Sequence, residues 1–416
     1  MNLSPVVIAI PMYFILMGIE LLVLRFQKSP SYRLNDAITN INLGVVSQVS
    51  GVFLKVLSIG IYIFFFEKFG LFQIPNNVWT FFILFFLYDL CYYWAHRLSH
   101  EINLFWGAHV VHHSSEEYNL SVALRQSSTQ TIWTFIFYLP LAVIGFDPVM
   151  LVLVSGINLL YQFWIHTEAI DRMGFLEKFM NTPSHHRVHH GRNPKYIDKN
   201  HGGTFIIFDK WFGTFQEEEE RPTYGITTPV QSWNPVWVNI SHYALMKKEM
   251  GNISGLKDKM RYLYNKPGWL PDYLGGYREV KDVGSDYKKF DTAVPLALNW
   301  YVFFQYIVLM GLTAFFLFNL DKFDWTTKAG LSVLIIWSTV SFSGIFEQKR
   351  WYHIQEILRV AIFVVANWFI LRELAPENIS IVFLSIYAAL SYFWLWFNYG
   401  TVKNFQKSVN QTPQNA

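Results

Sequence analysis

Histidines occur in this chain at spacings that suit metal binding. Five lie within eighteen residues, as an HxxxH pair followed by an HxxHH triplet, and a second HxxHH triplet follows about seventy residues later. On a helix, residues three or four apart share one face, so each group can direct its imidazoles towards one point. The pattern predicts these metal ligands: His96, His100, His109, His112, His113, His186, His189 and His190.

The number of imidazoles indicates two metal ions rather than one. A tetrahedral zinc site takes at most four protein ligands, and here eight are available in matched patterns. Imidazole binds iron, copper, nickel and zinc. The only cysteine is Cys91, so a structural zinc finger is a poor fit and an intramolecular disulfide is excluded. His242 and His353 stand apart from the patterns, and we interpret them as ordinary packed or surface residues.

The composition is that of a polytopic membrane protein. Of the 416 residues, 52% are hydrophobic and only 15% are charged, whereas soluble domains carry about 25% charged residues. The net charge of +3 is too small to favour nucleic-acid binding. No basic stretch precedes the first apolar run, so we expect no cleavable signal peptide.

Nine apolar segments predict an all-α fold, a helical bundle in the membrane. The segments are 5–24, 41–66, 78–94, 131–144, 148–165, 297–319, 330–346, 355–371 and 379–398. The fourth and fifth form a hairpin that dips into or crosses the membrane and returns the chain to His166. Residues 166–293 are polar and form a soluble-side region. We therefore predict a catalytic domain at 1–293 and a C-terminal transmembrane region at 294–416.

The distribution of cations predicts the orientation of the bundle. Cytosolic loops are enriched in Lys and Arg. Most cations fall on the side that carries the histidines, while few, including Arg372, fall on the opposite side. The metal site is therefore predicted at the cytosolic surface of the membrane. The acidic run 217–220 is interpreted as a solvated loop on that side.

The metal pattern and the membrane setting together indicate lipid oxidation. Zinc could only act as a Lewis acid or activate water, whereas two irons activate dioxygen and attack unactivated C–H bonds. Lipid chains offer little other than C–H bonds. Asp89 lies in a predicted span and needs a partner; a ligand histidine and an ion pair with Arg97 or Arg125 are equally good candidates.

Three short motifs carry a family resemblance. HRLSH, HVVHH and HRVHH resemble the histidine boxes of the fatty acid hydroxylase/sterol desaturase superfamily of membrane di-iron enzymes. The longer segments across about 90–220, such as NTPSHHRVHHGRNPKYIDKNHGGTFIIFDKWFGTF, are similar to its alkylglycerol monooxygenase branch. The hydrophobic C-terminal third agrees with that branch.

The resemblance implies a specific chemistry. It implies a tetrahydrobiopterin-dependent enzyme with two Fe ions that uses dioxygen to hydroxylate the ether-bearing carbon of an alkylglycerol, which releases a fatty aldehyde. It adds His166 as a metal ligand and Glu101 as a catalytic residue that orients a ligand or contacts the pterin. It leaves open whether His185 or His201 joins the site; His201 stands where the branch more often has an aromatic residue. The expected location is the endoplasmic reticulum or a bacterial inner membrane.

Other functions compete with this one. The same metal boxes would serve a hydroxylase of an acyl chain, a sterol-like ring or an aminolipid, because substrate choice lies in the lipid channel. The electron donor could be a redox protein instead of a pterin. A metal transporter would place its ligands near the bilayer midplane, whereas these histidines lie at the ends of predicted helices on one side.

Overall fold

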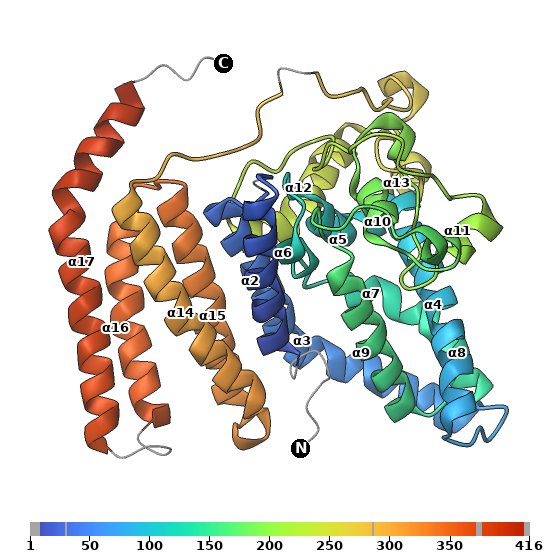
Figure 1. Cartoon of the computed structure of the whole chain (residues 1–416), viewed down its shortest axis with the longest axis horizontal. Coiled ribbons are helices and arrows are strands. Elements are labelled where there is room, and N and C mark those ends of the chain that lie inside the picture. Colours follow the sequence, from blue (N-terminus) through green and yellow to red (C-terminus); the bar gives the residue numbers. More distant parts are fainter. Residues whose placement is uncertain (1–8, 30, 285–286, 372–376, 412–416) are drawn as a thin grey trace. The chain divides into compact units, whose positions relative to one another are not determined.

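The computed structural model describes residues 9–29, 31–284, 287–371 and 377–411, and all regular elements in these ranges are helices (Figure 1). The predicted all-α class is confirmed. The start of the predicted span 5–24 and Arg372 lie outside the described residues. The chain divides into two compact units, one of residues 1–231 and 237–290 and the other of residues 232–236 and 291–416.

The first unit carries all the predicted metal ligands. Its longer helices are α2 (Ile10–Phe26), α3 (Leu34–Phe69), α4 (Val78–Glu101), α5 (Asn103–His113), α9 (Pro148–Trp164), α12 (Pro235–Asn252) and α13 (Leu256–Tyr264). Its shorter helices are α6 (Leu120–Ala123), α7 (Gln130–Thr134), α8 (Leu139–Ile144), α10 (Pro183–His190) and α11 (Ile207–Phe212). The 3₁₀ turns η1 (Phe135–Tyr138), η2 (Gly174–Lys178), η3 (Pro194–Tyr196) and η4 (Asp272–Leu274) complete it.

Among the described residues, six helices are long and apolar enough to cross a membrane. They are α3, α4, α14 (Leu296–Phe318), α15 (Trp325–Phe346), α16 (Tyr352–Leu371) and the apolar part of α17 (Glu377–Gln411). The other three predicted spans are shorter helices. The segment 130–144 is interrupted by the 3₁₀ turn η1, while α2 and α9 each have 17 residues, which is about 25 Å of helix.

The hairpin between α8 and α9 forms as its turn residues predict. Gly145 ends α8 with a φ of 111°, and a Cβ there would lie 2.0 Å from the carbonyl oxygen of Phe72. Only glycine tolerates both conditions. Asp147 then caps α9 by accepting hydrogen bonds from the backbone N–H groups of Val149 and Met150. The return of the chain to His166 therefore follows from local sequence.

An apolar core holds α4 against the α8–α9 hairpin. Its buried members come from α3, α4 and residues 141–154: Tyr62, Leu84, Tyr88, Leu141, Ala142, Phe146 and Val154. Burial of each large side chain contributes about 1.5–3 kcal/mol. This packing fixes α4 relative to α9, and therefore the ends of these helices at His96 and His166.

Asp89 has a partner that neither sequence hypothesis named. Its carboxylate accepts hydrogen bonds from the backbone N–H groups of Thr204 and Phe205, at 2.9 and 2.8 Å, and from the side chain of Asn158 at 2.6 Å. The proposed pairings with a ligand histidine, Arg97 or Arg125 were therefore wrong. Backbone donors satisfy a buried carboxylate without a counter-ion, and they join the 203–205 loop to α4 and α9.

The second unit is built around a buried polar network. Arg359 and Glu356 of α16 form an ion pair in which both side chains are completely buried. Tyr301 and Gln305 of α14, Ser341 of α15, and Tyr387 and Ser391 of α17 complete the hydrogen bonds. A charge in a membrane span needs such partners, so this network connects all four helices.

Candidate metal centre

The structure gathers the nine predicted ligands into two groups. In each group one nitrogen from every histidine lies within 4.8 Å of the others. The first group, here called the five-histidine cluster, is His96, His100, His109, His113 and His189. The second, the four-histidine cluster, is His112, His166, His186 and His190. All nine side chains are at most 7% exposed.

The two HxxHH triplets each serve both clusters, which differs from our expectation that all three residues share one site. From α5, His109 and His113 enter the five-histidine cluster and His112 enters the other. From α10, His189 enters the five-histidine cluster, while the i,i+4 pair enters the four-histidine cluster. At 3.6 residues per turn, positions i and i+4 differ by only about 40°, but i+3 lies about 60° to the other side.

The nitrogen separations fit coordination to a common ion. The Nε2 atoms of His96 and His109 are 2.9 Å apart, and those of His109 and His113 are 3.1 Å apart. In the four-histidine cluster, His166 Nε2 is 3.2 Å from His112 Nε2 and 2.9 Å from His186 Nε2. Two nitrogens about 2.1 Å from a metal and at right angles would be about 3 Å apart.

Several buried ring nitrogens have no other partner. Nε2 of His100, His189 and His190 finds no hydrogen bond in the described residues. A buried polar atom without a partner costs about 1–3 kcal/mol. Coordination to a metal ion removes this cost, so the donor set fits an imidazole-binding metal such as iron.

Backbone carbonyls set the tautomer of many of these ligands. In four of them, the Nδ1–H group donates to a backbone carbonyl oxygen at 2.7–3.0 Å. The donor and acceptor residues are His96 and His201, His112 and Arg125, His166 and Gln162, and His189 and Lys199. A carbonyl oxygen only accepts, so Nδ1 carries the hydrogen and the Nε2 lone pair faces the cluster. Such partners orient metal ligands and raise their basicity.

Burial keeps the imidazoles neutral, which is the form that binds metals. Burial lowers the pKa of His112 to about 4 and that of His189 to about 3. The pKa values of His113, His186 and His190 fall well below the usual range, first through burial and then through neighbouring histidines. Both clusters are therefore uncharged donor sets at neutral pH.

Asp209 holds the loop that positions His96. Its carboxylate accepts from the backbone N–H groups of His201 and Gly202, both at 2.7 Å, and from the hydroxyl of Thr214, also at 2.7 Å. The His201 carbonyl then accepts from His96. The sequence analysis missed Asp209; its only signal was an acid in the apolar stretch FIIFDKWF.

Glu218 anchors α10 instead of lying in a solvated loop. Its carboxylate accepts from Nε and Nη2 of Arg187 at 2.9 and 2.7 Å, and both side chains are buried. Glu217, Glu219 and Glu220 are exposed, as expected of the acidic run. A bidentate pair of this kind is strong, so Arg187 fixes the helix that carries three of the ligands.

Three further residues named from the sequence lie outside both clusters. Glu101 pairs with Arg97 at 3.1 Å, and its side chain is 24% exposed. His185 faces away to a separate cavity. The ring of His201 is buried against His100, with centroids 5.0 Å apart. The acid facing a ligand is instead Asp198, whose Oδ1 lies 3.8 Å from His100 Nδ1.

An opening of about 100 Å³ reaches both clusters. Ligands from each form part of its wall, together with aromatic and charged side chains. The lining includes His100, His113, His189, His190, Trp106, Arg192, Asp198, Lys266 and Tyr277. Trp106 contacts the ligands directly, with its ring 5.0 Å from that of His100. A small polar molecule therefore has access to the site.

Aromatic side chains lie near the ligand-bearing ends of α4 and α9, and two of them belong to the core. Tyr93 is fully buried and stacks on Phe212 at 5.3 Å, and Phe163 is buried against Tyr13 at 4.3 Å. Tyr92 lies closest to the ligands, with its ring 5.2 Å from that of His96. Packing, rather than lining a channel, explains Tyr93 and Phe163.

Comparison with known proteins places the site in a family. Residues 81–214, which include all nine clustered histidines, match the fatty acid hydroxylase model. Alkylglycerol monooxygenase of Homo sapiens is 37% identical over 93% of this chain and 87% of its own length; that of Danio rerio is 35% identical over 91% and 87%. Ornithine lipid hydroxylase OlsE of Rhizobium tropici is 28% identical over 33% of this chain and 43% of its own. No solved structure matches the chain.

These matches confirm the resemblance found in the histidine motifs. The full-length relatives extend through the C-terminal helices, while the hydroxylase of another lipid matches only a third of the chain. The six candidate spans indicate a multi-pass membrane protein. The chain therefore belongs to the alkylglycerol monooxygenase family and is an oxygen-dependent membrane oxidoreductase that acts on lipids.

Proposed function

We propose that this chain hydroxylates the ether-bearing carbon of alkylglycerols at a pair of irons held by nine histidines. The observation that carries the proposal is the pair of buried clusters, five and four imidazoles, whose Nε2 atoms face one another. Iron bound there would supply the ability to activate dioxygen towards a C–H bond. The human and zebrafish relatives, both alkylglycerol monooxygenases, support the ether substrate.

The proposed reaction cleaves the ether in two steps. One atom of dioxygen is inserted into the C–H bond beside the ether oxygen, and the other leaves as water after taking two electrons and two protons. The resulting hemiacetal then breaks its carbon–oxygen bond to give a fatty aldehyde and the free glycerol hydroxyl. The protein's part is to hold the ligands neutral and oriented and to keep the clusters buried.

The position of the ligands supports a substrate from the bilayer. His96 and His100 lie at the C-terminal end of the candidate span α4, and His166 follows α9 directly. The alkyl tail would therefore lie beside the spans, and the glycerol head near residues 166–293. An interfacial site of this kind takes an amphipathic lipid without removing its tail from the membrane.

We propose a tetrahydropterin as the two-electron donor, entering through the opening beside Trp106. The ring of Trp106 and the charges of Asp198 and Lys266 suit a small aromatic heterocycle with polar edges. Glu101 lies next to His100 in the chain but pairs with Arg97. We propose that Glu101 helps the reductant to bind, through Arg97 and through the charges of Asp198 and Lys266.

Substitution of Glu101 tests that role. Glu101→Ala is expected to lower pterin-dependent turnover and raise the KM for the pterin while the metal content stays near that of the parent protein. Glu101→Gln, which keeps the size but not the charge, should show the same direction. Steady-state kinetics and metal analysis on the same preparations measure both. A parallel loss of metal would instead assign Glu101 to the ligand shell.

The orientation of the second unit tests the cytosolic placement of the site. Tags within residues 217–220 and at the C-terminus should both be reached from the cytosol, because α14 to α17 cross an even number of times. A tag at Asp321, in the turn η5 (Leu320–Lys322), should be reached only from the other side. Labelling of sealed vesicles measures this, and an external 217–220 tag would overturn the orientation.

Product analysis tests the proposed function itself. Purified protein is given iron, dioxygen and a chain-labelled alkylglycerol, with and without tetrahydropterin. We expect labelled fatty aldehyde in a one-to-one ratio with oxygen consumed, and only with the pterin. A stable hydroxylated lipid with its ether bond intact would overturn the ether-cleaving assignment in favour of a hydroxylase of another lipid.

A further inference from the structure

An exposed apolar surface lies on the region expected to be soluble. It consists of two short segments, residues 174–179 and 211–212, which we call the lip. Phe175 is 69% exposed and Trp211 is 64% exposed, and Leu176, Phe179 and Phe212 are also exposed. Exposed apolar patches of this kind mark interaction surfaces, because water is a poor solvent for them.

The α11 segment of the lip packs beside a candidate membrane span. Phe208 and Trp211 of α11 pack on Phe86 of α4, with ring centroids 5.2 and 6.4 Å apart. Phe86 precedes His96 by ten residues, which places it about 15 Å farther into the span. The neighbouring Phe82 on α4 is 60% exposed and faces lipid if α4 crosses the membrane. The apolar surface of the lip therefore continues a lipid-facing surface.

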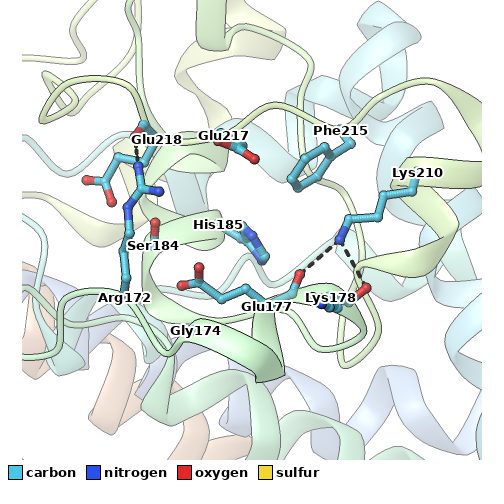
Figure 2. A pocket seen from close by; sticks show the side chains of 10 residues that line it. All are labelled: Arg172, Gly174, Glu177, Lys178, Ser184, His185, Lys210, Phe215, Glu217 and Glu218. Carbon is cyan, nitrogen blue, oxygen red and sulfur yellow. Dashed lines mark hydrogen bonds between the residues drawn. The ribbon is translucent and has the colours of Figure 1, made fainter.

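Lys210 joins the two segments of the lip, and Lys178 adds a second charge beside its exposed aromatic residues. Lys210 Nζ donates to the carbonyl oxygens of Glu177 and Lys178, at 2.9 and 3.0 Å, which connects α11 to η2 (Figure 2). Lys178 lies over the ring of Phe175, with Nζ 5.4 Å from the centroid. Cations with apolar stems beside exposed aromatic residues are typical of the membrane interface.

A polar cavity of about 190 Å³ lies directly beside the lip and shares its residues. Figure 2 shows His185 within this cavity, between Glu177 and Lys210. His185 is 3% exposed, and its Nδ1 has no hydrogen-bond partner in the described residues. The walls carry both signs of charge, from Arg172, Lys178 and Lys210 and from Glu177, Glu217 and Glu218.

We propose that the lip inserts into the boundary between headgroups and acyl chains, and that the cavity takes the headgroup of a zwitterionic phospholipid. The cationic side chains suit its phosphate, and Glu177 and Glu217 suit its amine. The continuity with α4 selects a bilayer as the occupant over a soluble protein. The site is separate from both metal clusters and does not depend on the identity of the substrate.

Spin labels report the depth of the lip. The background is Cys91→Ala, which removes the only cysteine, and the test position is Leu176→Cys in phosphatidylcholine nanodiscs. Phe82→Cys on α4 is the lipid reference, and the exposed Lys257→Cys on α13 is the water reference. We expect the label at 176 to resemble the one at 82 more than the one at 257: more accessible to oxygen, and several-fold less accessible to a water-soluble nickel complex, than the label at 257.

Two other results overturn the insertion. A label at 176 that is as accessible to the nickel complex as the one at 257 would place the lip in water. A label shielded from both oxygen and nickel would show that protein covers the lip, from a second copy or from another part of this chain. Each result is distinguishable in one set of spectra.

Native mass spectrometry tests the headgroup cavity. Protein in detergent is offered phosphatidylethanolamine, diacylglycerol with the same tails, or free phosphoethanolamine. We expect one phosphatidylethanolamine to be retained, and several-fold less with Lys210→Ala or His185→Phe but not with Lys257→Ala. Equal retention of diacylglycerol would show that tails alone are held. Equal competition by millimolar phosphoethanolamine would show a site for the free headgroup and not for a membrane lipid.

Discussion

Turnover is expected to fall below detection in both His112→Ala and His189→Ala, although the two variants should differ in metal content. The parent protein should hold close to two metal ions per chain. His112→Ala leaves three donors in the four-histidine cluster, so its metal content should fall towards one. His189→Ala leaves four donors in the five-histidine cluster and should retain more of that ion. Both lose activity because the proposed reaction needs both ions, each held by its full set of ligands.

The matched control is His242→Ala. His242 is a half-buried histidine whose Nε2 lies 2.8 Å from Oδ1 of Asn103, and it lies in neither cluster. It should keep two ions and measurable turnover. Metal identity must be measured along with its amount, because zinc outcompetes Fe²⁺ for nitrogen ligands. Full activity in several parent preparations with one ion per chain would contradict the two-ion site.

The second large effect is expected from Asp209→Ala, although Asp209 makes no hydrogen bond to a ligand histidine. The change leaves the N–H groups of His201 and Gly202 without their acceptor. The loop then no longer presents the His201 carbonyl to His96. Loss of such an outer partner costs about 10–100-fold in metal affinity. The loss should fall on the five-histidine cluster, since the four-histidine cluster makes no contact with this loop among the described hydrogen bonds.

Competitive chelation separates the two ions by affinity and measures this effect. Asp282→Ala, which changes an exposed acid, is the control and should leave both affinities unchanged. Asp209→Asn should be intermediate, because its side chain keeps one acceptor oxygen. An equal loss of both ions would show general destabilisation, and no loss would show that His96 holds its orientation without the loop.

The clustering of the candidate ligands was predictable because helical spacing is a local property. HxxxH and HxxHH need only the geometry of one helix. Eight of the nine histidines were predicted from these spacings, and His166 was added by the family resemblance. The division of each triplet between two clusters was not predictable, because it depends on how α4, α5, α9 and α10 pack. Spacing shows which side chains share a face, and packing decides what that face meets.

The supporting groups were hidden for a different reason. Most are backbone carbonyls, such as those of Arg125 and Lys199. Every residue has a backbone carbonyl, so the residue type does not show which one accepts a hydrogen bond. Asp89 and Glu218 carried a visible charge, but their partners lie far away in the chain. In the fold, apolar length predicted the six helices that are long enough to cross a membrane, and the other three apolar segments form shorter helices, one of them interrupted by η1.

The way α5 and α10 each contribute to both clusters restricts how the sequence can change. Inserting or deleting one residue within either helix turns everything beyond it by about 100°. Such a change would remove donors from both ions at once. Loop lengths outside these helices have no such restriction. Across lineages, the two proposed metal sites should therefore be inherited or abandoned together, and no descendant of this chain is expected to retain one without the other.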